Sequence, residues 1–322
     1  MLPTRDKLHI LFMHGAYQMA ERFAARNAGI AHTQARSYDE AIAHIAKADV
    51  VCVSMMWKNE LLARAPKLRF VQSISAGLDH YDVAAFKAAG VRLASAAGVN
   101  ANAVAEHAFA MMLGLQRQLH TGRDHQSAKH WRPMISVIGR REAEIAGKTV
   151  VIVGLGRIGT RIAHFARAFD MHVIGVKRGT SHGADGADEV VAISDLRSVL
   201  PRADIVVLAC PLTKDTEGLI GAGALAAMKP GAHLINVARG KVVDETALTA
   251  ALISGHIGAA ALDVTREEPL PVMSPLWAMP NVLITPHSAG ETQAYEDNVI
   301  DILLENLARQ WRGEAGLRND VC

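Results

Sequence analysis

Three polar residues in the second half of the sequence are suited, by type and by position, to the reduction of a carbonyl group. Arg239 follows the apolar run "HLINVA", Glu268 follows "AAALDV", and His287 ends "NVLITPH". An Arg can bind a carboxylate and polarise a carbonyl oxygen, and a His can donate a proton near neutral pH. A Glu bonded to the second ring nitrogen would favour the protonated imidazole. Together these roles predict reduction of a 2-oxo acid by hydride from a nicotinamide.

Each of these residues also has a structural interpretation. Arg239 would then form a salt bridge at a strand end, Glu268 would be one of two solvated acids beside Glu267, and His287 would be a buried histidine with satisfied hydrogen bonds. Taken singly, each residue favours that interpretation. Taken jointly, and with a dinucleotide-binding motif in the same chain, they favour catalysis.

That motif is the glycine turn "GLGRIG", which lies between the apolar run "KTVVIV" and a helical pattern. In a strand–turn–helix unit, Gly154 permits the tight turn, Gly156 lets a pyrophosphate approach the backbone, and Gly159 lets the helix pack on the strand. Arg157 and Ile158 fall at the start of the helix, where free N–H groups bind phosphate. We therefore expect these five residues to bind a dinucleotide rather than to form a purely structural turn.

Two cations, Lys177 and Arg178, stand in the stretch "HVIGVKRGT" where many such units have an acid that binds a ribose hydroxyl. Asp170 precedes this strand and is predicted to end the helix. Asp185 and Asp188 lie beyond a Gly-rich loop, too far along the sequence to occupy the strand end. Because cations attract a 2′-phosphate, the pattern predicts a preference for NADP(H), with NAD(H) as the second choice. The alternative is a pair of solvated surface charges.

The elements that must position these residues are short apolar runs that alternate with helical patterns. This alternation predicts an α/β fold with doubly wound parallel sheets. A segment from Asn100 to Leu119 is predicted as a helix between domains, and a segment from Ala294 as a helix that returns to the first domain. The predicted strands are "KLHILFMH", "ADVVCVS", "LRFVQSI" and "VRLASA" before residue 100, and "KTVVIVG", "HVIGVK", "ADIVVLAC", "HLINVA", "AAALDV" and "NVLITPH" after residue 147.

The composition excludes several classes of protein. The 322 residues suffice for two domains, and 34 Lys and Arg against 32 Asp and Glu leave a net charge of +2, without the basic block that nucleic acid or a membrane surface attracts. The three cysteines are far apart, which argues against disulfides and a metal site. The amino terminus has no signal-peptide pattern, and no apolar stretch reaches the roughly 20 residues that cross a bilayer. We expect a cytoplasmic protein that binds no nucleic acid, membrane or metal.

From about Ser75 to Gly290 the sequence resembles the D-isomer-specific 2-hydroxyacid dehydrogenases. The similar stretches, in the family's order, are "SAGLDHYDV", "VAEHAFAMML", "VGLGRIG", "CPLTKDTEGLI", "LINVARGKVVDETAL", "AALDVTREEPLP" and "PLWAMPNVLITPHSAG". The resemblance implies two doubly wound parallel-sheet domains. A Rossmann-like NAD(P)-binding domain, 101–289, would be inserted in a discontinuous flavodoxin-like substrate domain, 1–100 and 290–322. It also implies a homodimer joined largely through the cofactor domain.

The resemblance further implies roles for single residues. Arg239 would bind the substrate, Glu268 would support His287, and His287 would be the acid/base. The backbone amides around Ala76 and Gly77 would hold the substrate carboxylate. The residues that would line the cofactor are Pro211, Thr216, Val237, Ala238 and Asp263, with Asp263 against the nicotinamide carboxamide.

Lys177, Asp170 and the loop of Met55, Met56 and Trp57 add detail to the resemblance. NAD-using members have an Asp where Lys177 stands, so the sequence looks like the NADP-using glyoxylate and hydroxypyruvate reductases. Asp170 replaces a more usual Gly, which implies a left-handed backbone that Asp tolerates better than most residues. Met55, Met56 and Trp57 would bound the substrate pocket, where a Trp favours small acids; packing in the domain core is an equally favoured interpretation.

A different class of function is open to the same fold. Corepressors of the C-terminal-binding type, which are relatives, sense a cofactor and bind partner proteins. They typically carry extra tails, whereas this sequence ends a few residues after its last predicted helix. Formate dehydrogenases of the superfamily pair the His with Gln, so Glu268 argues against that activity. We therefore expect an NADP-preferring reductase that converts glyoxylate, hydroxypyruvate or a similar small 2-oxo acid to the D-2-hydroxy acid.

Overall fold

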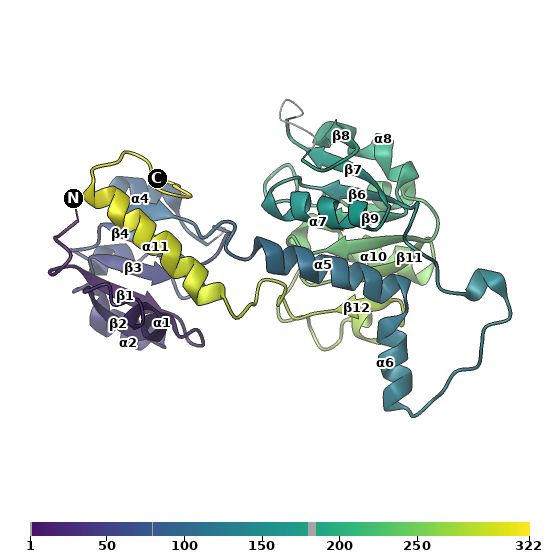
Figure 1. The fold of residues 1–322 in the computed structure, drawn as a ribbon, viewed down its shortest axis with the longest axis horizontal. Coiled ribbons are helices and arrows are strands. Elements are labelled where there is room, and N and C mark those ends of the chain that lie inside the picture. The colour runs from purple at the N-terminus through teal and green to yellow at the C-terminus, as the bar shows by residue number, and fades with distance from the viewer. Residues whose placement is uncertain (1, 79, 180–184) are drawn as a thin grey trace. The chain divides into compact units, whose positions relative to one another are not determined.

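The structure, a computed structural model, divides into two compact units (Figure 1). Unit 1 comprises Met1–Asn100 and Thr292–Cys322, and unit 2 comprises Ala101–Glu291. The described residues are 2–78, 80–179 and 185–322. Asp79 and Thr180, which belong to stretches quoted above, lie outside them.

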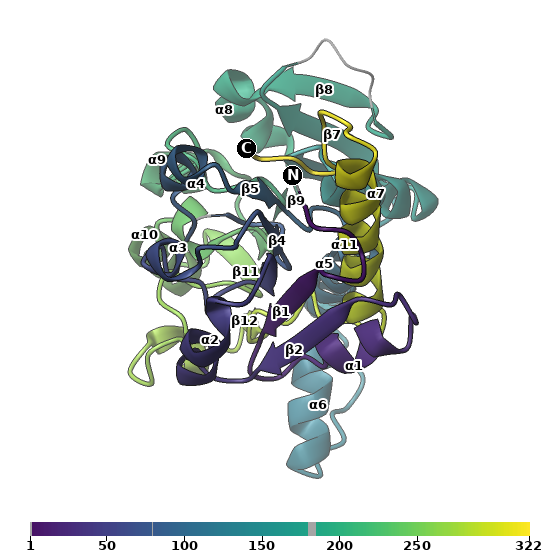
Figure 2. The same cartoon turned by 90° about the vertical axis from the view of Figure 1, so that its left-hand side faces the viewer.

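Unit 1 contains a five-stranded parallel sheet with the order β2-β1-β3-β4-β5 (Figure 2). This is the flavodoxin-like order, in which the strand order reverses between β1 and β3. The strands are β1 (His9–Met13), β2 (Ala31–Ala35), β3 (Val50–Val53), β4 (Phe70–Ser73) and β5 (Arg92–Ala94).

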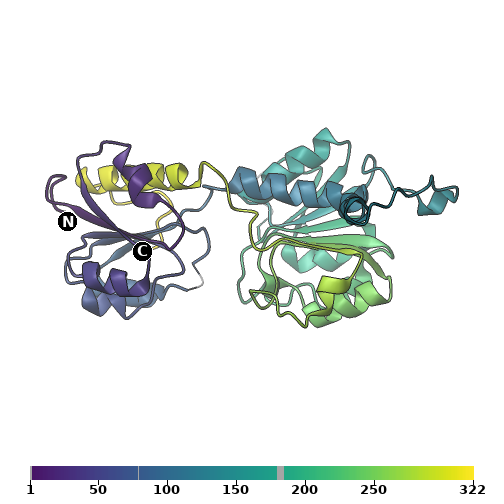
Figure 3. The ribbon, with the colours of Figure 1, turned by 90° about the horizontal axis from the view of Figure 1, so that it is seen from below.

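Helices cover both faces of this sheet (Figure 3). The helices α1 (Met19–Ala24) and α11 (Tyr295–Trp311) lie on one face, and α2 (Tyr38–Ile45), α3 (Leu61–Arg64) and α4 (Val83–Ala89) lie on the other. Although α11 comes from the far end of the chain, its Val299 and Leu303 share a core cluster with Ile10 and Phe12 of β1. The prediction that this helix returns to the first domain is confirmed.

Unit 2 contains a seven-stranded parallel sheet with the order β12-β11-β10-β9-β6-β7-β8. Counted from β6, the strands follow the Rossmann order 3-2-1-4-5-6, with β12 added at one edge. The predicted fold class, two doubly wound α/β domains with parallel sheets, is confirmed. The strands are β6 (Thr149–Val153), β7 (His172–Lys177), β8 (Glu189–Ala192), β9 (Ile205–Leu208), β10 (Ala232–Asn236), β11 (Ile257–Leu262) and β12 (Val282–Ile284).

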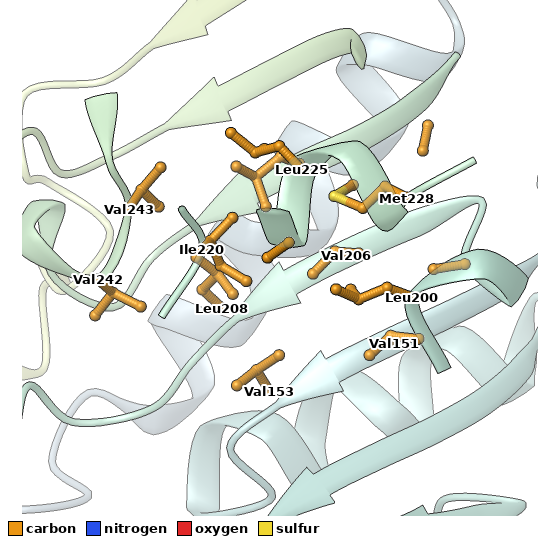
Figure 4. Close-up of a cluster of buried hydrophobic side chains, with 14 of the residues drawn as sticks. Val151, Val153, Leu200, Val206, Leu208, Ile220, Leu225, Met228, Val242 and Val243 are labelled. Atoms are coloured by element: carbon orange, nitrogen blue, oxygen red, sulfur yellow. The ribbon is translucent and has the colours of Figure 1, made fainter. Parts of the chain in front are cut away.

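Two hydrophobic clusters flank this sheet. On one face, α5 (Ala101–Gln116) and α7 (Arg157–Ala168) bury apolar residues against β6, β7, β10 and β11. On the other face, Val206 and Leu208 of β9 gather with Leu225 and Met228 (Figure 4). The remaining helices are α6 (Leu119–Ser127), α8 (Leu196–Val199), α9 (Ala222–Ala227) and α10 (Glu245–Ile253), with 3₁₀ turns η1 (Ile138–Arg140), η2 (Ile193–Asp195), η3 (Leu200–Arg202), η4 (Gly240–Val242) and η5 (Pro275–Ala278).

Two strands, β2 and β8, were not predicted, so the expected counts of four and six strands were each one too low. Both lie at the edge of a sheet. The β2 sequence is "AHTQA" and the β8 sequence is "EVVA", and most of their residues are at least partly exposed. An edge strand lacks a neighbour on one side, so it tolerates polar residues and gives no continuous apolar run. In the described part of the chain, no helix is both long and apolar enough to cross a membrane.

Candidate active site

The three predicted catalytic residues lie at one edge of the unit 2 sheet. The strands β10, β11 and β12 are parallel neighbours and end in register. Arg239 comes three residues after β10, Glu268 six residues after β11, and His287 three residues after β12. Ligands of open α/β sheets bind outside the carboxyl ends of the strands. The topology therefore brings the residues of the sequence-based prediction to the edge where such a site forms.

The imidazole of His287 and the carboxylate of Glu268 form a hydrogen-bonded ion pair, with 2.7 Å between Nδ1 and Oε2. The bond to Glu268 raises the pKa of His287 above its usual 6.5, although burial and the positive charge of Arg239 act to lower it. For Glu268, burial acts to raise the pKa, but the bond and charge of His287 outweigh this effect and lower it. Because Nδ1 is engaged by Glu268, Nε2 is the ring nitrogen left to face a substrate.

The backbone of His287 is in the left-handed region, with φ of +54°. Such a conformation is uncommon for residues other than Gly and persists where the surroundings determine it. Here the His287 N–H donates to the carbonyl oxygens of Asp263 (2.8 Å) and Thr285 (3.0 Å). The buried Asp263 carboxylate also accepts hydrogen bonds from the N–H groups of Ser288 (2.9 Å) and Ala289 (3.1 Å). Asp263 therefore holds the turn that presents the His287 side chain.

The Asp263 carboxylate has a further donor, since the hydroxyl of Thr285 lies 2.7 Å from Oδ1 and the His107 ring lies 2.9 Å from that hydroxyl. From the sequence, Asp263 was expected only to contact the nicotinamide carboxamide, and that contact stays a prediction. The sequence did contain a signal from which the role of Asp263 in positioning His287 could have been inferred. Asp263 and Thr285 are each the first residue after a strand, and β11 and β12 are neighbours in register.

The half-buried Arg239 belongs to a loop that packs tightly against the loop of Glu268. A Cβ added to Gly240 would lie 1.9 Å from the carbonyl group of Thr265, so the approach requires Gly at this position. The N–H of Thr265 in turn donates to Oε1 of Glu268 at 3.1 Å. Arg239 Nη1 donates to the carbonyl oxygen of Ala238 at 2.7 Å, and the guanidinium charge acts on the pKa of both His287 and Glu268.

A cavity of about 600 Å³ opens beside His287 and Glu268 within unit 2. Its apolar wall includes Pro269, Leu270 and Trp277, none of which the sequence analysis singled out. The volume falls in the range that holds small organic ligands. The site thus combines an imidazole whose pKa is raised, a carboxylate that is hydrogen-bonded to it and a partly apolar cavity.

The glycine turn meets the requirements of a pyrophosphate site. Gly154 has φ of +102°, and a Cβ there would lie 2.8 Å from the backbone of Cys210. A Cβ on Gly159 would lie 1.9 Å from the Gly154 carbonyl oxygen, whereas a Cβ on Gly156 would meet nothing within 4 Å. Gly156 is also the N-cap of α7, which begins at Arg157. The turn is therefore tightly packed at Gly154 and Gly159 and has open space at Gly156, at the start of a helix where N–H groups can bind phosphate.

The end of β7 differs from the expectation in one respect. Lys177 is the last residue of the strand, and Arg178 follows it with an exposed side chain. Asp185, however, places Oδ2 only 2.9 Å from Nζ of Lys177. Asp185 was expected to lie too far along the sequence to occupy the strand end, but its carboxylate contacts the side chain of Lys177, the last residue of β7. The left-handed backbone predicted for Asp170 is confirmed by its φ of +57°.

The other residues expected to line the cofactor follow β9 and β10. Thr216 is buried, and its hydroxyl donates to the Pro211 carbonyl oxygen (2.7 Å) and accepts from the Thr213 N–H (2.8 Å). Val237 and Ala238 are also buried. The hydroxyl of Thr216 therefore stabilises the turn after β9, and contact of these residues with a cofactor stays a prediction.

The substrate-binding residues expected near the amino terminus lie in unit 1. Trp57 is only 3% exposed, its ring centroid lies 5.2 Å from that of Phe86, and its Nε1 donates to Asn59. The structure thus favours core packing for Trp57 over a place at the pocket surface. In the same loop Met55 is 81% exposed and Met56 is partly buried.

A cluster of serine hydroxyls in unit 1 holds the loop that contains Ala76 and Gly77. The Ser75 hydroxyl lies 3.0 Å from that of Ser54 and 3.1 Å from that of Ser73, and it donates to the Gly77 carbonyl oxygen at 3.1 Å. Among the described residues, no acceptor is paired with the N–H of Ala76 or of Gly77. The two amides were expected from the sequence, whereas the serines that support their loop were not.

Known proteins are similar to this chain over most of its length. The model of "D-isomer specific 2-hydroxyacid dehydrogenase, NAD binding domain" matches residues 109–289. D-3-phosphoglycerate dehydrogenase of Mycobacterium bovis is 37% identical over 278 residues, which are 86% of this chain and 52% of that protein. Glyoxylate/hydroxypyruvate reductase B of Citrobacter koseri is 38% identical over 258 residues, 79% of this chain and 78% of that protein. The chain thus spans about half the length of the mycobacterial relative.

Among solved structures, the TT0316 protein of Thermus thermophilus superposes with a TM-score of 0.85 at 30% identity. The match covers 98% of this chain and 100% of that protein. The similarity therefore extends over the residues of both units.

Proposed function

Because the chain belongs to the D-isomer specific 2-hydroxyacid dehydrogenase family, we propose that it reduces a small 2-oxo acid to the D-2-hydroxy acid. The observation that carries this proposal is the pairing of His287 with Glu268 at 2.7 Å, at the edge of the sheet where Arg239 also lies. The nearby glycine turn has the open backbone that a dinucleotide needs.

In the proposed reaction, a bound NADPH or NADH supplies the hydride that adds to the carbonyl carbon. His287 gives the proton on Nε2 to the carbonyl oxygen, which becomes the hydroxyl of the product. Glu268 orients the imidazole through Nδ1 and raises its pKa, which favours the charged form before the transfer. Arg239 binds the substrate carboxylate and polarises the carbonyl oxygen, on which negative charge develops.

We propose glyoxylate or hydroxypyruvate as the substrate. Support comes from the similarity to glyoxylate/hydroxypyruvate reductase B, most of which the chain covers, while the chain covers only about half of the phosphoglycerate dehydrogenase. The amides of Ala76 and Gly77 are proposed to hold the substrate carboxylate, and their lack of a described acceptor supports this role.

The experiment that tests the function is a panel of 2-oxo acids assayed with NADPH and with NADH. The acids are glyoxylate, hydroxypyruvate, pyruvate and 3-phosphohydroxypyruvate. We expect the highest kcat/KM with NADPH and one of the first two acids. Absence of turnover with every acid would contradict an enzymatic role and favour the alternative, a cofactor-sensing protein that binds partners.

The proposed cofactor preference for NADP(H) rests on the cations at the end of β7. Lys177→Asp is expected to lower the ratio of kcat/KM for NADPH to that for NADH by roughly tenfold or more, because an acid there repels a 2′-phosphate and accepts a bond from a ribose hydroxyl. The measurement is that ratio with one fixed oxo acid. Lys67→Asp, an exposed site in unit 1, is the control for the change in net charge. An unchanged ratio would show that Lys177 does not set the cofactor preference.

The expected pH dependence follows from the raised pKa of His287. Reduction requires the protonated imidazole, so the rate falls as pH rises through this pKa, and an upward shift extends activity to higher pH. Glu268→Gln removes the carboxylate that causes the shift, so the fall in kcat/KM should begin at lower pH. Glu267→Gln, which changes the neighbouring exposed acid, is the matched control. Identical pH profiles for Glu268→Gln and the unmodified enzyme would exclude Glu268 from the mechanism.

We also propose that the protein is a homodimer joined through unit 2. Of the eleven large hydrophobic side chains exposed in the described part of the chain, five fall between residues 119 and 138. They include Trp131 and Met134, each 96% exposed, and Ile138, 78% exposed. Several large apolar side chains exposed in one segment of the chain are typical of a surface that a second protein chain covers. The molar mass in solution, measured by light scattering, tests this proposal.

A further inference from the structure

The carboxylate of Asp185 forms an ion pair with Lys177, the cation on which the proposed cofactor preference depends. The distance from Oδ2 to Nζ is 2.9 Å, and the side chains of Lys177 and Asp185 are 14% and 41% exposed. The end of β7 therefore presents a cation beside an acid, instead of the cations alone that the sequence indicated.

The position of Asp185 is determined by its neighbours on both the helix and the strand side. Gly186 has φ of +87°, and a Cβ there would lie 2.5 Å from the ring of His164 in α7, so the backbone sits directly on that helix. Two residues further on, the Asp188 N–H donates to the Val173 carbonyl oxygen at 2.9 Å, and the Val173 N–H donates to the Asp188 carboxylate at 2.8 Å. These contacts attach the segment that carries Asp185 to β7 and α7.

We propose that Asp185 is a specificity-determining residue that lowers the preference of this chain for NADP(H). The inference rests on the proposed use of a nicotinamide dinucleotide at this strand end. A 2′-phosphate of about −1.5 to −2 charges must displace Asp185 from Lys177 or bind beside it, and the carboxylate opposes both. A ribose with a free 2′-hydroxyl meets no such repulsion and finds an acceptor in the same carboxylate. The pair of Lys177 and Asp185 thus fits a site that accepts both cofactors.

The test measures binding without any oxo acid. The dissociation constants of NADP⁺ and NAD⁺, which differ only in the 2′-phosphate, are determined by calorimetry for the unmodified protein and for Asp185→Asn. Asn is the suitable replacement because Asp185 has φ of +46°, and Asn tolerates this left-handed backbone. We expect the ratio of the NAD⁺ to the NADP⁺ dissociation constant to rise by roughly tenfold.

The matched control is Glu189→Gln, which breaks another ion pair in the same region. Glu189 is paired with Arg202 at 2.6 Å and stands opposite Ile174, three residues before Lys177 and therefore about 10 Å from the strand end. It should leave the ratio unchanged. A ratio that does not rise in Asp185→Asn, or that rises equally in Glu189→Gln, would overturn the proposal. Because no oxo acid is present, inactivity in the substrate panel would refute the proposed reaction without affecting this result.

Discussion

Replacement of His287 by Asn is expected to lower kcat for the reduction by about 10² to 10⁴-fold, the range that a positioned general acid contributes. The hydrogen bond to Glu268 raises the pKa of His287 and so favours the protonated form of this imidazole. An amide cannot donate a proton in its place. Asn is preferred to Ala here because the backbone of residue 287 has φ of +54°, which Asn adopts with less strain.

The measurement is steady-state kinetics with a saturating cofactor, together with the dissociation constant of the cofactor. We expect kcat to fall while the dissociation constant changes by less than about threefold, since this side chain acts on the oxo acid. His172→Ala, at the opposite end of a unit 2 strand, is the control and should retain activity. If His287→Asn kept kcat within threefold of the unmodified enzyme, another residue would have to supply the proton.

Replacement of Arg239 by Ala is expected to lower kcat/KM by about 10³-fold, because the substrate loses both its carboxylate partner and the cation beside its carbonyl oxygen. KM should rise and kcat should fall, since the guanidinium acts on the bound substrate and on the transition state. Arg239→Lys keeps the positive charge but lacks the planar guanidinium with its paired N–H donors, so its kcat/KM should be higher than that of Arg239→Ala but lower than that of the unmodified protein. Arg266→Ala, an exposed arginine in unit 2, is the control.

The same variant has a second expected effect that a merely structural role would not produce. The charge of Arg239 acts to lower the pKa of His287, so its removal should raise that pKa further. The alkaline fall in kcat/KM of Arg239→Ala should therefore shift to higher pH, opposite to the shift expected for Glu268→Gln. A pH profile that shifts to lower pH, or does not shift, would show that the charge of Arg239 does not lower the pKa of His287.

The strand–turn–helix unit around the glycine turn was predictable from the sequence because its signals are local. The apolar run before Gly154, the spacing to Gly159 and the helical pattern after it form one continuous strand–turn–helix unit. The same holds for Arg239 and His287, which follow strands that are recognisable as apolar runs. Since parallel strands present their carboxyl ends at one edge, knowing each strand end was enough to place the two residues on the same edge.

Edge strands and core packing were harder to predict from the sequence. The polar β2 and β8 give no apolar run, because a strand at the edge of a sheet is not buried on both sides. Trp57 could be assigned to a pocket or to the core with equal reason, and only its contact with Phe86 decided for the core. Whether a side chain is buried depends on which elements pack together, so it cannot be predicted from one segment of the sequence.

What the sequence by itself determined is the order of the elements and the chemical groups at the strand ends, because both follow from patterns a few residues long. Only the tertiary structure decided how those groups are held and paired. Asp263 supports the left-handed turn at His287 from a different strand, and Asp185 returns to Lys177 because Gly186 packs on His164 of α7. These contacts join residues that loops and helices separate in the chain. Their geometry is set by packing between elements, and this packing determines where each carboxylate acts.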